Sequence, residues 1–349
     1  MTSAPNALAK LGIPLSLSPM EALLVAELPK DAQGWQFEPK WDGFRCLAFR
    51  AGREVEIKAK SGKSLSRFFP EVLANMRAVP HATFVLDGEL VIPIAGKLSF
   101  DALQMRLHPA QSRIDRLAGE TPATLILFDC LLTRPRQPLL SRPFAQRREA
   151  LEGFFHAIGE VHDLALTPFT RELRKARQWL NGRHASLDGV VAKRLDLPYR
   201  PGERATLKIK RRRTADCVVG GFRYESNRRQ VGSLLLGLYD KAGLLHHVGF
   251  TSALAGRDKA ALTERLKKLV AQPGFTGDAP GGPSRWSTER SAEWEPLKPK
   301  LVVEVAYDHL TGNRFRHGTK LLRWRPDKTP RQCTFDQLPR RSGPVLRLR

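Results

Sequence analysis

Lys40 lies in a short charged segment, residues 38–45, with the sequence E-P-K-W-D-G-F-R. The pattern K-x-D-G-x-R places an amine, a carboxylate, a glycine and a guanidinium close together in the chain. An unprotonated lysine amine can attack an activated phosphorus, and arginine is suited to binding a phosphate or a ribose. Gly43 would let the backbone approach a ligand closely. A surface turn with solvated charges is the alternative, so the rest of the chain must decide between the two.

The chain carries a large excess of positive charge. Its 349 residues include 58 Lys and Arg against 35 Asp and Glu, which gives a net charge of +23. Such an excess favours a polyanionic partner, because each phosphate that is neutralised releases counterions. Charge alone leaves nucleic acid and anionic lipid as alternatives, and ribosomal proteins can be equally basic.

Composition predicts a soluble protein of a reducing cytoplasm. A hydrophobic share of 42% with 27% charged residues is typical of soluble globular proteins. We find no apolar run near 18 residues, and the N-terminal segment lacks the features of a secretory signal. The four cysteines contain no C-x-x-C pair, which argues against zinc and favours buried structural thiols. These cysteines are Cys46, Cys130, Cys217 and Cys333.

The first part of the chain predicts an α+β domain with a largely antiparallel sheet, because a long βαβ alternation is not sustained. Residues 1–25 are expected to form an irregular lead-in. Strands are then expected at the Lys40 segment and at residues 44–49, 54–58, 84–91, 125–128 and 189–193. Helices are expected at residues 70–76, 100–107 and 142–158.

The sequence pattern changes from mixed helices and strands to mostly strands at the basic run KIKRRR, residues 208–213. We therefore expect one domain over residues 1–212 and a second over 213–349. Beyond the run, short strands and one amphipathic helix predict an all-β barrel, with the OB-fold as the natural candidate. The strands are expected at 217–224, 232–239, 244–250 and 301–308, the helix at 257–270, and a Gly/Pro-rich loop at 273–283.

Positive charge is denser in the second part of the chain. From Arg213 onward there are 25 basic and 13 acidic residues, against 33 and 22 in the longer segment before it. That density suits a module that lies along a phosphate backbone.

A series of further motifs follows Lys40 in chain order. They are KSGKSLSRFFPE (60–71), LDGEL (86–90), LFD (127–129), LDGVVAK (187–193), LKIK (207–210) and RHGTKLLRWRPDK (316–328). With the Lys40 segment, this ordered series resembles the covalent nucleotidyltransferase superfamily, and most closely the ATP-dependent DNA ligases. The resemblance covers nearly the whole chain and is greatest to the short standalone bacterial class called ligase C. It implies a nucleotidyltransferase, or adenylation, domain followed by an OB-fold domain.

The resemblance implies an enzyme that joins DNA in three steps. Lys40 would attack the α-phosphorus of ATP and hold AMP as a phosphoramidate, AMP would move to the 5′-phosphate at a nick, and the 3′-hydroxyl would displace it. The implied partner is nicked double-stranded DNA, bound by a monomer in the nucleoid-associated cytoplasm and used in DNA repair. The OB domain would turn between the first step and the later ones.

Each motif acquires an implied role at the nucleotide. Lys208 and Lys210 would lower the pKa of Lys40 and neutralise the α-phosphate. Arg45 would contact ribose and phosphate, while Glu38 lies where ligases recognise the adenine edge, largely through backbone. Phe128 would stack on adenine, and a plain core phenylalanine is the alternative.

Two carboxylates are implied in metal binding. Glu89 resembles the residue that holds the ribose hydroxyl and supports the metal, and Asp188 stands where a glutamate is common. Asp188 is shorter by a methylene, so its ligation would run through water, as Mg²⁺ readily accepts. Mg²⁺, with Mn²⁺ as the alternative, would screen phosphates and activate the attacking oxygen. Lys60 replaces an arginine that grips the 5′-phosphate, which keeps the charge but loses the bidentate fork.

The last motif resembles the OB-domain element that closes over ATP and orients the leaving pyrophosphate. A basic exposed loop is the alternative. The expected catalytic residues are therefore Lys40, Lys208 and Lys210, and the expected metal ligands are Glu89 and Asp188. The expected nucleotide-binding residues are Glu38, Arg45, Lys60, Glu89, Phe128, Arg323, Arg325, Asp327 and Lys328.

Other functions share parts of this pattern. RNA ligases and RNA-capping guanylyltransferases contain the same lysine motif, and a non-catalytic nucleic-acid-binding protein could keep the fold. Such a protein would show a lost lysine or a broken metal set, and this sequence shows neither. NAD⁺-dependent ligation is disfavoured, because those enzymes carry a nicotinamide-reading domain and a four-cysteine zinc cluster.

Overall fold

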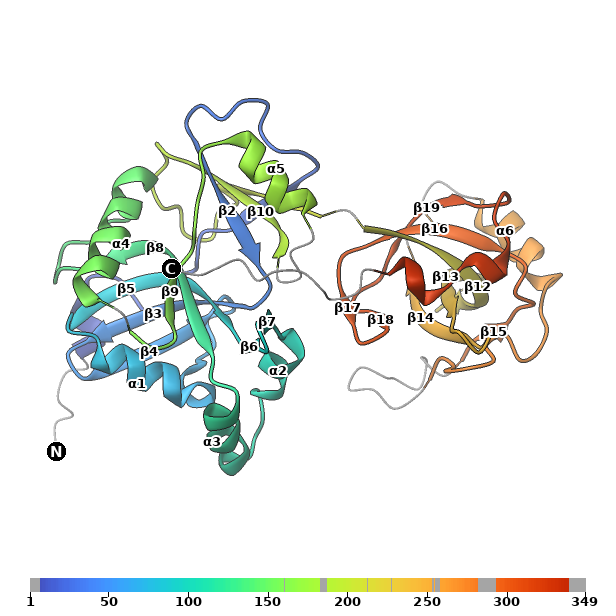
Figure 1. The fold of residues 1–349 in the computed structure, drawn as a ribbon, viewed down its shortest axis with the longest axis horizontal. Coiled ribbons are helices and arrows are strands. Elements are labelled where there is room, and N and C mark those ends of the chain that lie inside the picture. Colours follow the sequence, from blue (N-terminus) through green and yellow to red (C-terminus); the bar gives the residue numbers. More distant parts are fainter. Residues whose placement is uncertain are drawn as a thin grey trace. The chain divides into compact units, whose positions relative to one another are not determined.

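The computed structural model describes residues 7–159, 161–182, 187–211, 213–226, 228–252, 254, 258–281 and 293–338. The chain divides into two compact units, and the boundary falls between Arg211 and Arg212 (Figure 1).

The N-terminal unit is built on two sheets. The five-stranded sheet has the order β4-β3-β5-β8-β9, and the four-stranded sheet has the order β1-β11-β10-β2. Neighbouring strands are antiparallel except β1 with β11 and β8 with β9. The first sheet contains β3 (Phe44–Ala51), β4 (Glu54–Ala59), β5 (Thr83–Val91), β8 (Thr124–Leu132) and β9 (Leu164–Leu166). The second contains β1 (Ala22–Val25), β2 (Trp35–Trp41), β10 (Leu187–Arg194) and β11 (Thr206–Lys210).

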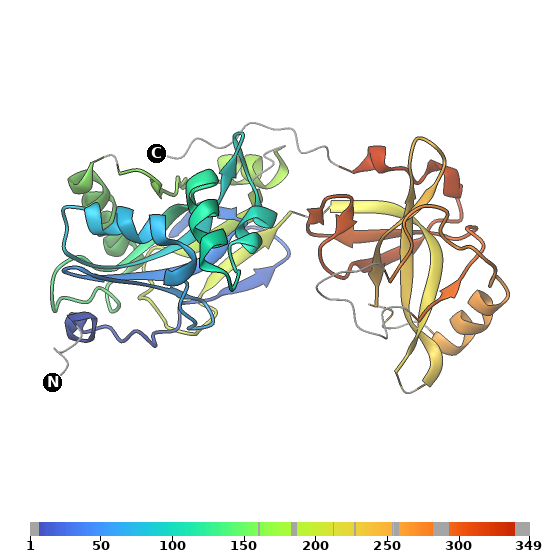
Figure 2. The same cartoon turned by 90° about the horizontal axis from the view of Figure 1, so that it is seen from below.

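Helices cover one face of the five-stranded sheet. Met76 of α1 and Phe154 of α4 share a buried cluster with sheet residues such as Leu86, and Figure 2 shows both helices on the same side. A second cluster, which includes Phe37, Ile126 and Trp179, lies between the two sheets. The helices of this unit are α1 (Pro70–Ala78), α2 (Phe100–Met105), α3 (Gln111–Glu120), α4 (Phe144–Ile158) and α5 (Leu173–Asn181), and β6 (Pro93–Ile94) pairs with β7 (Lys97–Leu98).

The expected strands and helices of the N-terminal unit are confirmed, with small changes at their ends. Helix α4 begins directly after Pro143, which suits a helix start, and its apolar residues recur at helical spacing. The expectation of an irregular lead-in is wrong in part, because Ala7–Leu11 forms a 3₁₀ turn and Ala22–Val25 forms β1. Edge strand β1 escaped notice because it is short and its central leucines are exposed.

The C-terminal unit is an antiparallel sheet with one helix. Its strands run in the order β14-β13-β12-β16-β19, with β15 beside β12. They are β12 (Arg213–Glu225), β13 (Arg228–Tyr239), β14 (Leu245–Thr251), β15 (Glu295–Pro296), β16 (Val302–Tyr307) and β19 (Lys320–Trp324), and a hairpin joins β17 (Leu310–Thr311) to β18 (Arg314–Phe315). Helix α6 (Lys259–Lys267) is capped by the Asp258 side chain, which accepts from the Ala261 N–H.

The sheet of the C-terminal unit closes on itself. Thr251, at the end of β14, forms a parallel bridge with Thr319, which directly precedes β19. The Thr251 hydroxyl also donates to the Thr319 carbonyl at 2.8 Å. Since β14 and β19 are the two edges of the sheet, this contact makes it a barrel, as the sequence predicts. Part of the expected 273–283 loop lies outside the described residues.

None of the helices in the described part of the chain is long and apolar enough to span a membrane. All four cysteines are buried and unbridged, as expected of structural thiols.

Candidate active site

Lys40 stands in a row of residues that crosses three strands. On β2 it lies opposite Gly189 of β10, which in turn lies opposite Lys210 of β11. A Cβ atom on Gly189 would fall 2.0 Å from the Ile209 carbonyl oxygen. Only glycine therefore lets β10 and β11 approach so closely, and this brings the two lysines to the same part of the sheet.

A β-bulge directs Asp188 toward Lys40. The pairing passes from Leu187 opposite Trp41 to Gly189 opposite Lys40, which leaves Asp188 as the extra residue. Bulges re-aim side chains in this way. The Asp188 Oδ2 lies 2.5 Å from the Lys40 Nζ and 3.8 Å from the Lys210 Nζ, and its carboxylate is only 4% exposed. The structure therefore brings these three predicted residues together.

The pKa of Lys40 is raised rather than lowered. Burial alone would lower it, but the charge and hydrogen bond of Asp188 outweigh burial. The expectation of a lowered pKa is thus wrong for this structure, because the carboxylate in direct contact with Lys40 outweighs the nearby lysines. The lowered pKa belongs to Lys208 instead, through its burial and the nearby cations of Lys40, Lys60 and Lys210.

The five-stranded sheet places Arg45 on β3 directly opposite Glu89 on β5. Arg45 binds Asp87 through two hydrogen bonds, of 3.1 and 2.7 Å. The Tyr199 hydroxyl donates to the same carboxylate at 2.7 Å. The LDGEL motif points to Glu89 rather than Asp87, and the sequence gives no sign of Tyr199, which lies 112 positions from Asp87. Together they fix the direction of the Arg45 guanidinium.

Glu89 is held by the segment that contains Lys40. Its carboxylate accepts the Gly43 N–H at 3.1 Å. A Cβ on Gly43 would lie 2.2 Å from the Leu90 carbonyl oxygen, so this glycine serves close packing against β5. Burial raises the pKa of Glu89 to about 7, although Lys40, Arg45 and the Gly43 N–H favour its charged form. A buried carboxylate with so high a pKa would gain from a further cation.

Phe128 is also placed by a bulge. Asp129 pairs with Asp87 and Leu127 pairs with Gly88, so Phe128 is the extra residue of β8. Its half-buried ring lies 5.3 Å from the Arg45 guanidinium carbon and 4.6 Å from the Lys193 Nζ. Phe128 belongs to none of the hydrophobic clusters of the described residues. These facts favour the stacking role over the core alternative.

Glu38 is buried in a polar network. Lys193 Nζ lies 2.7 Å from one of its oxygens, and Gln36 donates to the other at 2.9 Å. Lys193 also donates to the Phe128 carbonyl at 3.0 Å. No role was expected for Lys193, although this residue ends the LDGVVAK motif. Its position in β10, next to the core residue Ala192, is the signal that could have indicated it. Lys193 thus links Glu38 to Phe128, the two residues that are expected to contact the adenine base.

Lys60 lies at the edge of the same site. Its backbone N–H donates to the Arg45 carbonyl at 3.1 Å, and its Nζ lies 3.0 Å from the Glu21 carboxylate. The side chain is 55% exposed, so it remains accessible to a phosphate. The pairing with Glu21 gives direction to a lysine that lacks the fork of an arginine.

The four predicted residues of the last motif form one cluster in the C-terminal unit. Arg323 pairs with Glu304 at 2.6 Å, and Arg325 binds Asp327 through its Nε and Nη2. Lys328 lies 2.7 Å from Asp216. The four residues thus belong to one ion-pair network, in which the Arg323 and Asp327 side chains remain exposed.

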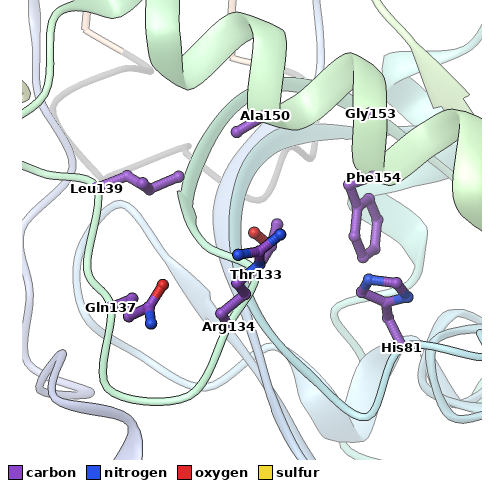
Figure 3. A pocket seen from close by; sticks show the side chains of 8 residues that line it. All are labelled: His81, Thr133, Arg134, Gln137, Leu139, Ala150, Gly153 and Phe154. Carbon is purple, nitrogen blue, oxygen red and sulfur yellow. The ribbon is translucent and has the colours of Figure 1, made fainter.

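A separate cavity of about 410 Å³ lies beside α4 (Figure 3). Its walls include His81 and Phe154, which meet edge to face with ring centroids 5.4 Å apart. None of the predicted site residues lines it, so it is distinct from the site around Lys40. The lining residues are His81, Thr133, Arg134, Gln137, Leu139, Ala150, Gly153 and Phe154.

The site around Lys40 suits a nucleotide. Its lysines and Arg45 suit a polyphosphate and a ribose, and the accessible face of Phe128 suits a base. With the barrel in the second unit, these features define the class of lysine-dependent nucleotidyltransferases.

Comparison with known proteins confirms the class and narrows it. The family described as ATP dependent DNA ligase domain matches residues 19–210, and the ATP dependent DNA ligase C terminal region matches residues 227–328. The chain belongs to the ATP-dependent DNA ligase family, and its second unit is the OB-fold domain of that family.

The relatives include standalone bacterial ligases. The chain is 44% identical over 334 residues to DNA ligase C1 of Mycolicibacterium smegmatis, covering 92% of this chain and 93% of that protein. It is 41% identical to DNA ligase C of Mycobacterium tuberculosis, covering 93% and 94%. Among solved structures, a minimal Lig E DNA ligase shares the fold with a TM-score of 0.53, at 15% identity over 88% of this chain and 100% of that chain.

We predict that the Asp188→Asn variant makes the Lys40 amine more reactive. Removing the carboxylate charge removes the main interaction that raises the pKa of Lys40, so more amine is unprotonated near pH 8. The measurement is competitive acetylation read by peptide mass spectrometry, and the expected change is a several-fold faster labelling of Lys40. Lys60, which pairs with Glu21, is the internal control. Equal or slower labelling of Lys40 would contradict the assignment.

We also predict that the unfolding free energy of the metal-free Glu89→Gln variant increases relative to that of the wild type as pH rises. A folded pKa of about 7 lies above the ordinary value of 4.5, so the stability contributed by Glu89 is full below pH 4.5 and is lost as pH rises through 7. Glutamine does not titrate. The unfolding free energy of the variant should therefore gain on the wild type by on the order of 2 kcal/mol between pH 5 and pH 8.

Denaturant unfolding in the presence of EDTA measures this difference. Glu203→Gln, which removes a carboxylate from the surface, is the matched control. A difference between Glu89→Gln and wild type that stays constant with pH would show that Glu89 is an ordinary carboxylate.

Proposed function

We propose that this protein seals nicks in double-stranded DNA that carry a 5′-phosphate and a 3′-hydroxyl, through an AMP intermediate on Lys40. The observation that carries the proposal is the position of Lys40 beside Asp188 and Lys210, at the centre of the cationic site. The membership of the chain in the ATP-dependent DNA ligase family supports it.

In the first step, the Lys40 nitrogen forms a bond to the α-phosphorus of ATP while the bond to pyrophosphate breaks. The amine must first lose the proton that its contact with Asp188 at 2.5 Å retains. Lys208 and Lys210 oppose the charge on the α-phosphate. Basicity alone would favour Lys208 as the nucleophile, because its pKa is lowered. The position of Lys40 beside Asp188 and Lys210 favours Lys40 instead.

The nucleotide itself is held by the five-stranded sheet and β10. Phe128 stacks on the adenine, and the buried Glu38 network sets the shape of the base site. Arg45, fixed by Asp87, contacts ribose and phosphate. Lys60 then binds the 5′-phosphate of the nick, for which its exposure is suited.

A divalent metal fits this site. Glu89 and Asp188 offer the hard oxygen donors that Mg²⁺ or Mn²⁺ prefers, and two carboxylates with substrate phosphates are a usual magnesium site. Burial raises the pKa of Glu89, and a bound cation would stabilise its charged form. When bound, the metal would screen the phosphates and compete with Lys40 for Asp188.

The C-terminal unit contributes the last motif. In the proposal Arg323, Arg325, Asp327 and Lys328 close over ATP and orient the leaving pyrophosphate. The domain then turns, and its excess of positive charge lies along DNA. The protein acts as a monomer near the nucleoid in DNA repair. That setting is supported by 29% identity over 321 residues to a Mycobacterium tuberculosis protein named as a non-homologous end joining DNA repair protein, LigD.

Labelling with α-labelled ATP and Mg²⁺ tests the intermediate. We expect denatured wild-type protein to retain one acid-labile AMP, and Lys40→Ala to lose at least 1,000-fold of this labelling rate, roughly 4 kcal/mol of transition-state stabilisation. Lys97→Ala, on the exposed β6–β7 hairpin, is the control and should label normally. Labelling of Lys40→Ala at the wild-type rate would end the proposal.

Substrate choice separates the remaining alternatives. We expect ATP to label the protein and GTP to fail, and nicked DNA to be sealed faster than nicked RNA. Transfer of GMP would indicate a guanylyltransferase, and preferred sealing of RNA would indicate an RNA ligase. Both outcomes would contradict the DNA substrate while leaving Lys40 as nucleophile.

A further inference from the structure

Asp216 lies at the centre of the cation cluster in the C-terminal unit. Its Oδ1 accepts a hydrogen bond from the Arg325 Nη1 at 2.9 Å, and its Oδ2 accepts one from the Lys328 Nζ at 2.7 Å. The Asp216 side chain is only 13% exposed, so the two cations contact a carboxylate that is largely buried. Neither the motif nor its spacing indicates this residue, because Asp216 precedes Arg325 by 109 positions.

The backbone of Asp216 is itself clamped. Its N–H donates to the Gln337 Oε1 at 2.8 Å, and the Gln337 Nε2 donates back to the Asp216 carbonyl at 2.9 Å. Asp216 also lies within the β12–β16 pairing. The carboxylate is therefore anchored to the rigid barrel and not to a loop.

This carboxylate occupies an unfavourable position in the sheet. Asp216 of β12 lies directly opposite Glu304 of β16, and like charges in that arrangement are destabilising. Arg325 offsets the repulsion, since its Nη1 lies 2.9 Å from Asp216 and 4.0 Å from Glu304. The two carboxylates therefore depend on the cations that they hold.

We propose that Asp216 is the positioning residue that holds Arg325 and Lys328 in the orientation in which they meet the pyrophosphate of ATP. The inference rests on the proposed role of the last motif in the first step. Long cationic side chains lose much rotamer freedom when they bind, and an anchored carboxylate removes that freedom in advance. Arg325 has five N–H groups, and its bonds to Asp216 and Asp327 leave further N–H groups for phosphate.

The test uses Asp216→Asn in the full chain. Asparagine keeps the shape but loses both the repulsion with Glu304 and the pairing with Arg325 and Lys328, so thermal unfolding is measured to confirm that the barrel is folded at the assay temperature. We expect the rate of lysine adenylation at saturating ATP to drop 10- to 100-fold. Sealing of a nick that already carries AMP should stay within twofold of wild type, because no pyrophosphate leaves in that step. Asp240→Asn, a carboxylate paired with His246 in the same unit, is the matched control and should leave both rates unchanged.

Three outcomes would overturn the inference. Adenylation at or above the wild-type rate would show that Asp216 only balances charge. Equal loss in adenylation and in sealing of the pre-adenylated nick would show a merely structural role. The Arg325→Ala variant distinguishes the inference about Asp216 from the proposed role of the last motif in the first step. If Arg325→Ala adenylates normally, the role of the last motif fails, whereas a defect in Arg325→Ala without one in Asp216→Asn removes only the inference about Asp216.

Discussion

The contact between Lys40 and Asp188 is the constraint on which the rest of the site depends. It exists because a bulge in β10 turns one extra residue toward the lysine and because Gly189 lets β11 approach closely. The contact keeps the amine charged and in place, so in the proposed function it would orient the nucleophile and hold it inactive before reaction. A site built this way favours reaction only when phosphates and a cation rearrange its charges, which links catalysis to binding.

Pairs of carboxylates that hold arginines occur in the five-stranded sheet and in the barrel. A bulge in β8 releases Phe128 from the core, and it also brings Asp87 opposite Asp129, where Arg45 binds the former and Arg147 the latter. Asp216 and Glu304 form a comparable pair in the C-terminal unit. In both cases paired carboxylates, unfavourable by themselves, fix the direction of an arginine that is expected to meet phosphate, Arg45 in the first and Arg325 in the second.

Sequence indicated the fold and the members of the site because both depend on local patterns. Alternating apolar residues marked β5 and β8, and motifs such as LDGEL supplied Glu89. The residues that the sequence did not indicate depend on contacts between positions that are far apart in the chain. Lys193, Tyr199 and Asp216 act through partners far away in the chain, and the raised pKa of Lys40 follows from a bulge that spacing does not reveal. The roles assigned to the site residues remain predictions.

Lys40, and not a more weakly basic neighbour, is the proposed carrier of AMP. Peptide mass spectrometry of the protein after reaction with ATP and Mg²⁺ tests it most directly, because it locates the added nucleotide on one side chain. We expect the mass of a single AMP on the peptide that contains Lys40. Attachment to Lys208, whose lowered pKa makes it the natural competitor, would contradict it.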